Sequence, residues 1–480
     1  MWTLLASALA ILLFLVSFYG LGVVRVARDA LDRMRASVTV MRDRDLDDDD
    51  KEAAVRQAGI ALLGATASIL VRSAGCLLIS AAPIYGFAAL GLTTVDGVFA
   101  FLLRWDVIVV TSVAIAAGMY WAARGGDAAS GYSPMDRAVH GLAYSRPFVQ
   151  LAASDLEDTL FRRDIERVAD RPPVFVTSLP RAGTTVLLTA LHGVPGVATH
   201  LYRDMPFVMA PLLWSRLSGG FAKSSELRER AHGDGIQVGY DSPEAFEEVL
   251  WRAFWPQKYR PDRIELWGPG DLDADASEFF RRHFRKLVAL RCGGNGRYVS
   301  KNNGNIARLA LLPAMFPGAR IVVPLRQPIE HAASLLRQHE NFAARHARDR
   351  FVKRYMRDIG HLEFGELHTP FDFDGFGELA AGLGPGDPDY WLAYWIAGYR
   401  EVLARAGGLH LVPQDALGDR PGPTMEALCR AIGVDPGETD FTDHFRPVAG
   451  RADAGRFDPA LVATARDIYE ALRDAAANRA

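Results

Sequence analysis

The sequence predicts an α/β fold, in which a P-loop-like three-layer domain with a central parallel sheet follows an N-terminal module of transmembrane helices. Three observations lead to this prediction. Long apolar runs gather in the first 125 of the 480 residues. From about residue 133, short apolar segments alternate with amphipathic ones, which is typical of a parallel sheet covered by helices. One of these segments, "VFVTSLPRAGTTVLL" at 174–188, runs from a β-branched stretch through a glycine-containing loop into a helix-like stretch.

Three apolar runs in the module of residues 1–125 predict transmembrane helices at 2–24, 73–92 and 107–123. The first run is about long enough to cross a bilayer of ~30 Å. It lacks the basic start and cleavage site of a signal peptide, so we expect it to be retained. The basic residues that follow it favour the cytoplasmic side, which would place the N-terminus outside; they are Arg25, Arg28, Arg33 and Arg35.

The second apolar run, 59–92, is longer than one span needs and is interrupted by Arg72. It predicts either one tilted helix, or an interfacial helix at 59–71 followed by a crossing at 73–92. Three crossings would leave residues 133–480 in the cytoplasm. The alternative is a buried helical hairpin of a soluble protein.

Composition limits the function classes. The net charge of −3 gives no global basic field, so we expect no nucleic-acid partner. Arginine, alanine and glycine are abundant and lysine is rare, which suggests a bacterial protein and hence the bacterial plasma membrane. Cys76, Cys292 and Cys429 are scattered, so we expect neither disulfides nor a metal site, and a reducing compartment for the catalytic part. Whether the chain forms a homodimer stays open.

The domain at 133–480 is expected to be built from alternating strands and helices. Strands are predicted at 174–178, 298–300, 321–324 and 409–412. Helices are predicted at 185–192, 243–254, 330–339, 390–406 and 423–432. Loops rich in glycine, proline and aspartate separate them.

The loop in "SLPRAGTT" is the first candidate site. Backbone N–H groups at the start of the following helix would point at one anion, which the helix dipole also favours. Gly183 lets the backbone approach the ligand, and Arg181 adds a fixed charge with several donors. The loop is not a Walker A sequence, because no lysine follows Gly183. We predict a phosphate site formed by Arg181, Ala182, Gly183, Thr184 and Thr185.

A second candidate site follows the strand at 321–324. Arg326 comes just after this strand, and Ser334 lies eight residues later in the next helix. A guanidinium and a hydroxyl in these places can hold one phosphate at the mouth of a parallel sheet, where ligands normally bind.

Together these segments resemble the sulfotransferase family, whose donor is 3′-phosphoadenosine-5′-phosphosulfate. The family's loop for the 5′-phosphosulfate is matched by "SLPRAGTT", and its element for the 3′-phosphate by Arg326, Pro328 and Ser334. A family lysine is matched by Lys301 in "VSKNNGNIARL", and a weaker fourth element by "LVPQDALGDRP". The resemblance spans about 172–434 and is greatest to bacterial and Golgi-type members.

This resemblance implies a mechanism. Sulfuryl transfer is an in-line displacement that depends on positioning and positive charge, as phosphoryl transfer does. The resemblance assigns Arg181 to the phosphosulfate and Lys301 to the sulfuryl group, with no metal. Arg446 and Arg451 are further candidates for closing over the 3′-phosphate.

The general base is less well defined. Cytosolic family members use a histidine two residues after the lysine, where this chain has Asn303. Bacterial and Golgi-type members place a glutamate after the second strand, and here that region offers Asp204, which we favour, and His200. A third candidate is the aromatic-rich helix expected at 243–254, in which Glu244 and Glu248 would share one helix face that lines an acceptor pocket.

The expected function is transfer of a sulfuryl group to a hydroxyl of a lipid, a lipid-linked glycan or a polysaccharide precursor, because a membrane tether suits a lipid-proximal acceptor. Two alternatives stay open: a P-loop-like nucleotide kinase or hydrolase, and a catalytically inactive nucleotide-binding scaffold at the membrane. The basic segment 337–361 is either a solvated helix face or a surface for anionic headgroups or an anionic acceptor.

Overall fold

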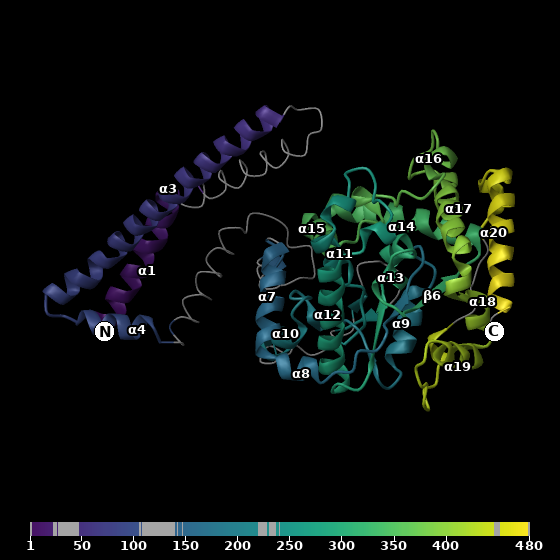
Figure 1. Ribbon diagram of the computed structural model, residues 1–480, viewed down its shortest axis with the longest axis horizontal. Helices are drawn as coiled ribbons and strands as arrows, with labels where there is room; N and C mark the ends of the chain where they lie inside the picture. Colours follow the sequence, from purple (N-terminus) through teal and green to yellow (C-terminus); the bar gives the residue numbers. More distant parts are fainter. Residues whose placement is uncertain are drawn as a thin grey trace. The chain divides into compact units, whose positions relative to one another are not determined.

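The described residues of the computed structural model are 2–22, 26, 48–104, 107, 140–141, 143–145, 147–218, 228–229, 237–239, 241–445 and 452–478. The chain divides into two units, Met1–Gly125 and Gly126–Ala480 (Figure 1). The first unit contains helices α1 (Trp2–Gly20), α3 (Asp48–Ala89) and α4 (Val95–Leu102). The second unit contains the sheet and all of the candidate site.

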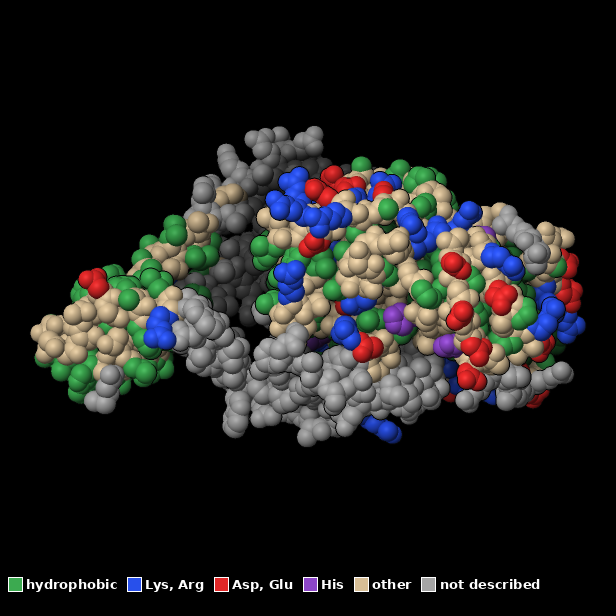
Figure 2. All heavy atoms as spheres, turned by 90° about the horizontal axis from the view of Figure 1, so that it is seen from below, with side chains coloured by type: hydrophobic (Ala, Val, Ile, Leu, Met, Phe, Trp, Pro, Cys, Tyr) green, Lys and Arg blue, Asp and Glu red, His purple; other side chains and the backbone are tan. Residues whose placement is uncertain are grey.

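In the first unit, α1 packs against α3 and α4 through Ala6, Ala10, Ile84 and Val98. The small alanine side chains allow close approach of the helices. Much of the remaining surface is apolar, as Figure 2 shows, and Leu78 of α3 is 75% exposed. Within the described residues, one helical segment, Gly64–Ala89, is long and apolar enough to cross a membrane.

The second predicted span does not have the form of an interfacial helix at 59–71 followed by a separate crossing helix. α3 continues without a break through Arg72, so residues 59–71 do not form a separate helix. Arg72 is accommodated because its Nε donates to Ser68 Oγ at 3.0 Å and its Nη1 donates to the Leu21 carbonyl. The third predicted span, apart from Val107, and the four arginines after the first span lie outside the described residues.

The second unit is built on a five-stranded sheet in the order β2-β5-β1-β6-β7. All neighbouring strands pair in parallel, as predicted. The strands are β1 (Val174–Val176), β2 (Val197–Ala198), β5 (Arg297–Lys301), β6 (Arg320–Leu325) and β7 (Leu409–Pro413). The sequence did not predict β2, which has only two residues. Because the strands are parallel, their carboxyl ends meet at one edge.

Helices cover both faces of the sheet, which gives the predicted three layers. Alternate residues of β1 point to opposite faces, since successive side chains of a strand alternate. Val174 and Val176 pack in one core with α9 (Thr184–His192) and α19 (Pro421–Ala431). Phe175 packs in the other core with α12 (Ala274–Cys292), α14 (Pro328–Arg348) and α17 (Pro388–Ala404).

The remaining elements lie around these layers. The other helices are α7 (Pro147–Leu160), α8 (Arg162–Glu166), α10 (Pro211–Ser218), α11 (Glu248–Phe254), α13 (Leu312–Met315), α15 (Arg350–Ile359), α16 (Phe376–Leu379), α18 (Gln414–Asp419) and α20 (Pro459–Ala477). A separate antiparallel pair joins β3 (Arg228–Glu229) to β4 (Gln237–Val238).

The helix expected at 243–254 is shorter than predicted and begins only at Glu248. The residues before it pair with the segment after β2 instead: Pro243 forms a β-bridge with Leu201, and the Glu244 N–H donates to the His200 carbonyl at 3.0 Å. Glu244 and Glu248 therefore do not share one helix face.

Candidate active site

A cavity of about 280 Å³ lies at the carboxyl ends of the central strands. The loop after β1, the last residue of β5 and the first residue after β6 all reach it, because these three strands are neighbours. The structure thereby brings together six of the predicted residues, which are Arg181, Gly183, Thr184, Thr185, Lys301 and Arg326. Ala182 is part of the same loop and is fully buried.

The loop between β1 and α9 holds an uncommon backbone shape. Arg181 has a φ of +73° and Gly183 a φ of +89°, and a left-handed residue other than glycine is rare. A buried chain of hydrogen bonds holds the loop: Trp395 Nε1 donates to His331 Nδ1 at 3.2 Å, and His331 Nε2 lies 2.7 Å from the Pro180 carbonyl. Because the indole donates to Nδ1, we assign the ring proton to Nε2, which donates to the carbonyl.

His331 stays neutral in this chain. Burial, followed by the charge of Arg326, lowers the pKa of His331 to about 3. A neutral imidazole can accept one hydrogen bond and donate the other, as the arrangement between Trp395 and Pro180 requires. His331, which does not titrate near neutral pH, thus holds the loop between β1 and α9 through its hydrogen bond to Pro180.

Two guanidinium groups lie at the same end of the cavity. Arg326 Nη1 donates to the Arg181 carbonyl at 2.8 Å, and Arg181 Nε donates to Ser334 Oγ at 3.4 Å. Burial and the neighbouring Arg181 lower the pKa of Arg326. The buried Arg326 Nε has no hydrogen-bond partner among the described residues. Two close cations with a donor to spare suit a multiply charged anion. Ser334 positions Arg181 and does not itself line the cavity.

Lys301 and Asn303 line the cavity next to these cations. Lys301 ends β5 and is buried to 5% exposure. Asn303 is held by the first loop, because Thr184 Oγ1 donates to its Oδ1 at 3.3 Å and Thr177 Oγ1 donates to its carbonyl at 3.3 Å. The strand end therefore carries its lysine and amide at fixed places beside the phosphate loop.

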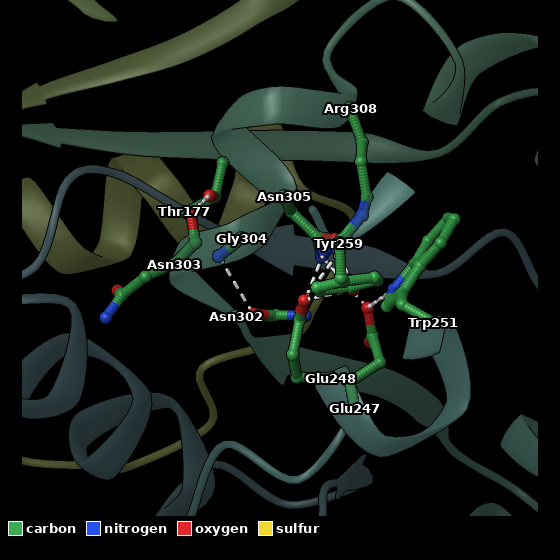
Figure 3. Close-up of polar contacts among 10 residues, drawn as sticks. All are labelled: Thr177, Glu247, Glu248, Trp251, Tyr259, Asn302, Asn303, Gly304, Asn305 and Arg308. Carbon is green, nitrogen blue, oxygen red and sulfur yellow. Dashed lines mark hydrogen bonds and ion pairs between the residues drawn. The ribbon is translucent and has the colours of Figure 1, made fainter. Parts of the chain in front are cut away.

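Glu248 does not line this cavity but a neighbouring one, which it shares with Asn302 and Asn303. Figure 3 shows its polar contacts. Its carboxylate accepts from Arg308 Nη1 at 2.9 Å, from Arg308 Nη2 at 2.7 Å, from Asn302 Nδ2 at 2.8 Å and from the Tyr259 hydroxyl. Burial alone would raise the pKa of Glu248, but Arg308, with the hydrogen bonds from Tyr259 and Asn302, outweighs it and the pKa is lowered. Because the ion pair and hydrogen bonds occupy this carboxylate, it suits a positioning role better than the base role considered for it.

The adjacent Glu247 binds the same segment, residues 302–308, through different hydrogen bonds. Its carboxylate accepts from Trp251 Nε1 at 3.0 Å, from the Tyr298 hydroxyl at 3.0 Å and from Asn305 Nδ2 at 2.9 Å. Arg308 lies between two indole rings, 4.3 Å from the centroid of each, contributed by Trp251 and Trp267. The two glutamates thus fix the short helix Asn303–Arg308 that follows Lys301 (Figure 3).

Asp204 and His200, the other two base candidates, do not line the cavity. Both are buried, each with 1% exposure. Asp204 accepts from the Leu201 N–H at 2.8 Å and pairs with Arg291, while His200 Nε2 lies 3.0 Å from His283 Nε2. These contacts tie the segment after β2 to α12. The structure therefore does not place either residue where an acceptor hydroxyl would react.

Glu363 is an acid in the cavity that the sequence reasoning missed. Asn303 Nδ2 lies 3.5 Å from Glu363 Oε1, and His361 Nδ1 lies 3.3 Å from Oε2. Burial would raise the pKa of Glu363, but His361 and Lys301 outweigh it and keep the pKa lowered. An ionised carboxylate thus faces the end of β5. Its only local signal is the sequence "HLEF" after Gly360, which ends α15 in a left-handed conformation.

The far wall of the cavity is mainly apolar. Phe342, Met356 and Phe364 line it together with His346. His346 is 3% exposed, and neither of its ring nitrogens has a hydrogen-bond partner among the described residues. The cavity thus has a cationic end at the sheet and an apolar end with the imidazoles of His346 on α14 and of His361 after α15.

The remaining sequence predictions concern two arginines, a metal site and the fourth element of the sequence pattern. Arg446 and Arg451 lie outside the described residues. Within the described part of the chain, no three His, Cys, Asp or Glu side chains lie close enough to hold a metal ion. Gln414, from the fourth element of the sequence pattern, does line the cavity.

Comparisons with known proteins place this site in context. Residues 172–366 match the profile of the sulfotransferase family. Sulfotransferase STF9 from Mycobacterium avium superposes with a TM-score of 0.42 and 14% identity, covering 72% of this chain and 87% of that one. For sulfotransferase STF1 from Mycobacterium tuberculosis H37Rv the TM-score is 0.40 and the identity 16%, covering 75% of this chain and 91% of that one. No curated protein matches the chain in sequence.

Proposed function

Because residues 172–366 match the model of the sulfotransferase family, we propose that the protein moves a sulfuryl group from 3′-phosphoadenosine-5′-phosphosulfate to a hydroxyl of a lipid, a lipid-linked glycan or a polysaccharide. The observation that carries this proposal is the meeting of Arg181, Lys301 and Arg326 in one cavity. Three cations at the ends of three neighbouring strands suit a donor with two separate anionic ends.

The donor would lie along the cationic end of the cavity. The backbone of the loop 181–185 and Arg181 would hold the 5′-phosphosulfate, and Arg326 would hold the 3′-phosphate with its unpartnered Nε. The donor supplies the activated sulfuryl group. Lys301 then stabilises the charge that develops on the sulfuryl oxygens and the leaving phosphate during in-line displacement.

We propose Glu363 as the group that takes the proton from the acceptor hydroxyl. It shares the cavity with Lys301 and lies next to Asn303, whereas Asp204 and His200 do not line the cavity. A carboxylate held at a low pKa by His361 and Lys301 is a weak base. An anionic donor bound at Lys301 would offset that charge, so donor binding would raise the pKa of Glu363 and make it a better base.

The acceptor body would occupy the apolar end of the cavity, against Phe342, Met356 and Phe364. We further propose that the protein is anchored in the bacterial plasma membrane by its N-terminal unit, with the catalytic unit in the cytoplasm. Support for the anchor is the apolar segment Gly64–Ala89 of α3. The expectation of three crossings, at 2–24, 73–92 and 107–123, remains a proposal.

The decisive test is nucleotide binding by the full chain in detergent, measured by titration calorimetry. 3′-Phosphoadenosine-5′-phosphate should bind at least tenfold more tightly than ADP, which lacks the 3′-phosphate. Arg326→Ala should weaken that binding by about 10- to 100-fold, since a hydrogen bond to a charged group contributes roughly 1.5–3 kcal/mol. Arg430→Ala, an exposed arginine on α19, serves as the control and should leave the affinity unchanged.

The same titration separates the alternatives. Equal or tighter ATP binding that Arg326→Ala does not affect would contradict the proposal and favour a kinase or hydrolase. Selective binding of the 3′-phosphorylated nucleotide without any transfer to membrane extracts would favour an inactive scaffold.

A further inference from the structure

Helix α15 (Arg350–Ile359) has two sharply different faces. Tyr355, Met356 and Ile359 are buried. The opposite face carries Arg350, Lys353, Arg354 and Arg357, whose spacing of three and four residues places them on one stripe. The side chains of Arg354 and Arg357 are 49% and 57% exposed. We call this stripe the arginine face.

Nearby acids neutralise only part of the arginine face. Asp358 lies 3.4 Å from Arg354 and 3.6 Å from Arg357, but it also pairs with His140 at 3.1 Å. Lys353 pairs with Glu366. Arg350 is exposed and has no ion pair with any described residue. The last turn of α14 adds Arg345 and Arg348 beside it. Asp349, directly before Arg350, is a third acid. The four basic residues of the arginine face and the exposed Arg348 still outnumber Asp349, Asp358 and Glu366, so the strip is net positive.

The same helices also form the wall of the cavity. Met356 reaches the cavity from α15, and Phe342 and His346 reach it from α14. The arginine face and the apolar wall are thus opposite sides of the same elements. A surface that binds the arginine face would lie one helix diameter from the proposed acceptor end, or about 10 Å.

An exposed aromatic residue lies on helix α7, which follows His140 in the sequence. His140 packs on α15, with its ring 5.8 Å from that of Phe351 and 5.2 Å from that of Tyr355. The chain then continues into α7 (Pro147–Leu160), where Phe148 is 73% exposed. Figure 1 shows α7 and α15 at the same end of this unit. This end of the unit thus carries both the arginine face and an exposed aromatic, and basic helices with exposed aromatic residues are common at membrane interfaces.

We propose that the arginine face of α15 binds the anionic headgroups of a membrane, and that it thereby brings the acceptor wall of the cavity to a lipid-borne acceptor. Charge complementarity favours an anionic surface, and the candidate membrane helix Gly64–Ala89 keeps such a surface close to the tethered unit. An acidic protein partner is the competing occupant. Only the link to the acceptor rests on the proposed function; the binding of headgroups does not.

The test is footprinting of the full chain with phenylglyoxal, which modifies exposed arginines, read by mass spectrometry. The protein is reconstituted in vesicles of phosphatidylcholine alone, or with roughly 30% phosphatidylglycerol. We expect modification of Arg350, Arg354 and Arg357 to slow at least about fivefold with the anionic lipid. Arg430 and Arg466, exposed on α19 and α20, are internal controls and should react equally in both vesicles.

A pair of matched variants completes the test. Arg350→Gln with Arg354→Gln should reduce the protection of Arg357, whereas Arg430→Gln with Arg466→Gln removes the same charge elsewhere and should not. Equal modification rates in the two vesicles would overturn the proposal and favour a protein partner. Because labelling needs no nucleotide, this result is independent of whether the donor binds.

Discussion

The two ends of the cavity are built in different ways. The cationic end consists of loop and strand-end residues: Arg181 in the loop after β1, Lys301 at the end of β5 and Arg326 directly after β6. The apolar end consists of helix and turn residues from α14, α15 and the segment after them. The sheet fixes the first end by its topology, while the second depends on how two amphipathic helices pack. We expect the end fixed by the sheet to bind the donor, and the end formed by helix packing to determine which acceptor binds.

The largest effect should come from the cationic end. Lys301→Ala should lower the rate of transfer from radiolabelled donor to a membrane lipid and glycan extract by about 10²- to 10³-fold, because one donor to a developing charge contributes that much. The affinity for 3′-phosphoadenosine-5′-phosphate, which has no sulfuryl group, should change by less than about threefold if Lys301 acts only in the transition state. Lys258→Ala lies outside the cavity and serves as the control. A parallel loss of nucleotide affinity would mean that Lys301 is a simple binding residue.

The next effect should come from the acceptor side. Glu363→Gln should lower transfer by about 10²-fold with unchanged nucleotide affinity, because the amide cannot take a proton. Since the pKa of Glu363 is lowered in the ligand-free protein, the wild-type kcat/KM should persist as pH falls to the usual range of a glutamate, and decline only below it. The decline of kcat, which reports the donor-bound protein, should lie at higher pH.

Asp204→Asn is the contrasting variant for this test. Asp204 pairs with the nearly buried Arg291, so its loss should reduce the free energy of unfolding by about 3–5 kcal/mol, read by chemical denaturation. Transfer per folded molecule should remain near that of the wild type. If Asp204→Asn abolished transfer and Glu363→Gln did not, the sequence-based choice of base would be restored.

The smallest effect concerns the support of the phosphate loop. His331 is neutral in the folded protein with a pKa of about 3, whereas in the unfolded chain it titrates near 6.5. The unfolded state therefore binds the extra proton as pH falls from 6.5 towards 3, which disfavours folding. The difference in unfolding free energy between the wild type and His331→Asn should shrink over this range, by at most about 1.4 kcal/mol per pH unit. A constant difference would mean that His331 is not buried as the neutral form.

The contrast also explains what the sequence could predict. Arg181, Gly183 and Arg326 could be placed because parallel strands bring their carboxyl ends together, so residues just after two predicted strands must meet. Glu363 could not be placed, because its position depends on the packing of α15 and on the turn at Gly360. Glu248 was placed on a helix but given the wrong surroundings: the partner that decides its role is Arg308, 60 residues further along the chain.

The two-residue strand β2 illustrates a second limit. Val197–Ala198 is too short to show a pattern, and the segment that follows it pairs with Pro243 by a single bridge. Because residues from Pro243 pair with that segment, the helix expected at 243–254 begins only at Glu248. The local signals there, a serine followed by proline, are shared by helix starts and by extended segments, so tertiary contacts decided between them.

Asn303 touches both ends of the cavity, since its Oδ1 accepts from Thr184 and its Nδ2 lies beside Glu363. A single amide of fixed length thus acts as a spacer between the donor loop and the proposed base. In-line displacement requires the reacting atoms to approach within about 3–3.5 Å, so a small error in this spacing would be costly. Glu247 and Glu248 hold the turn that carries Asn303 through hydrogen bonds from Asn305 and Asn302. These buried carboxylates therefore help to set the distance between the donor loop and the proposed base.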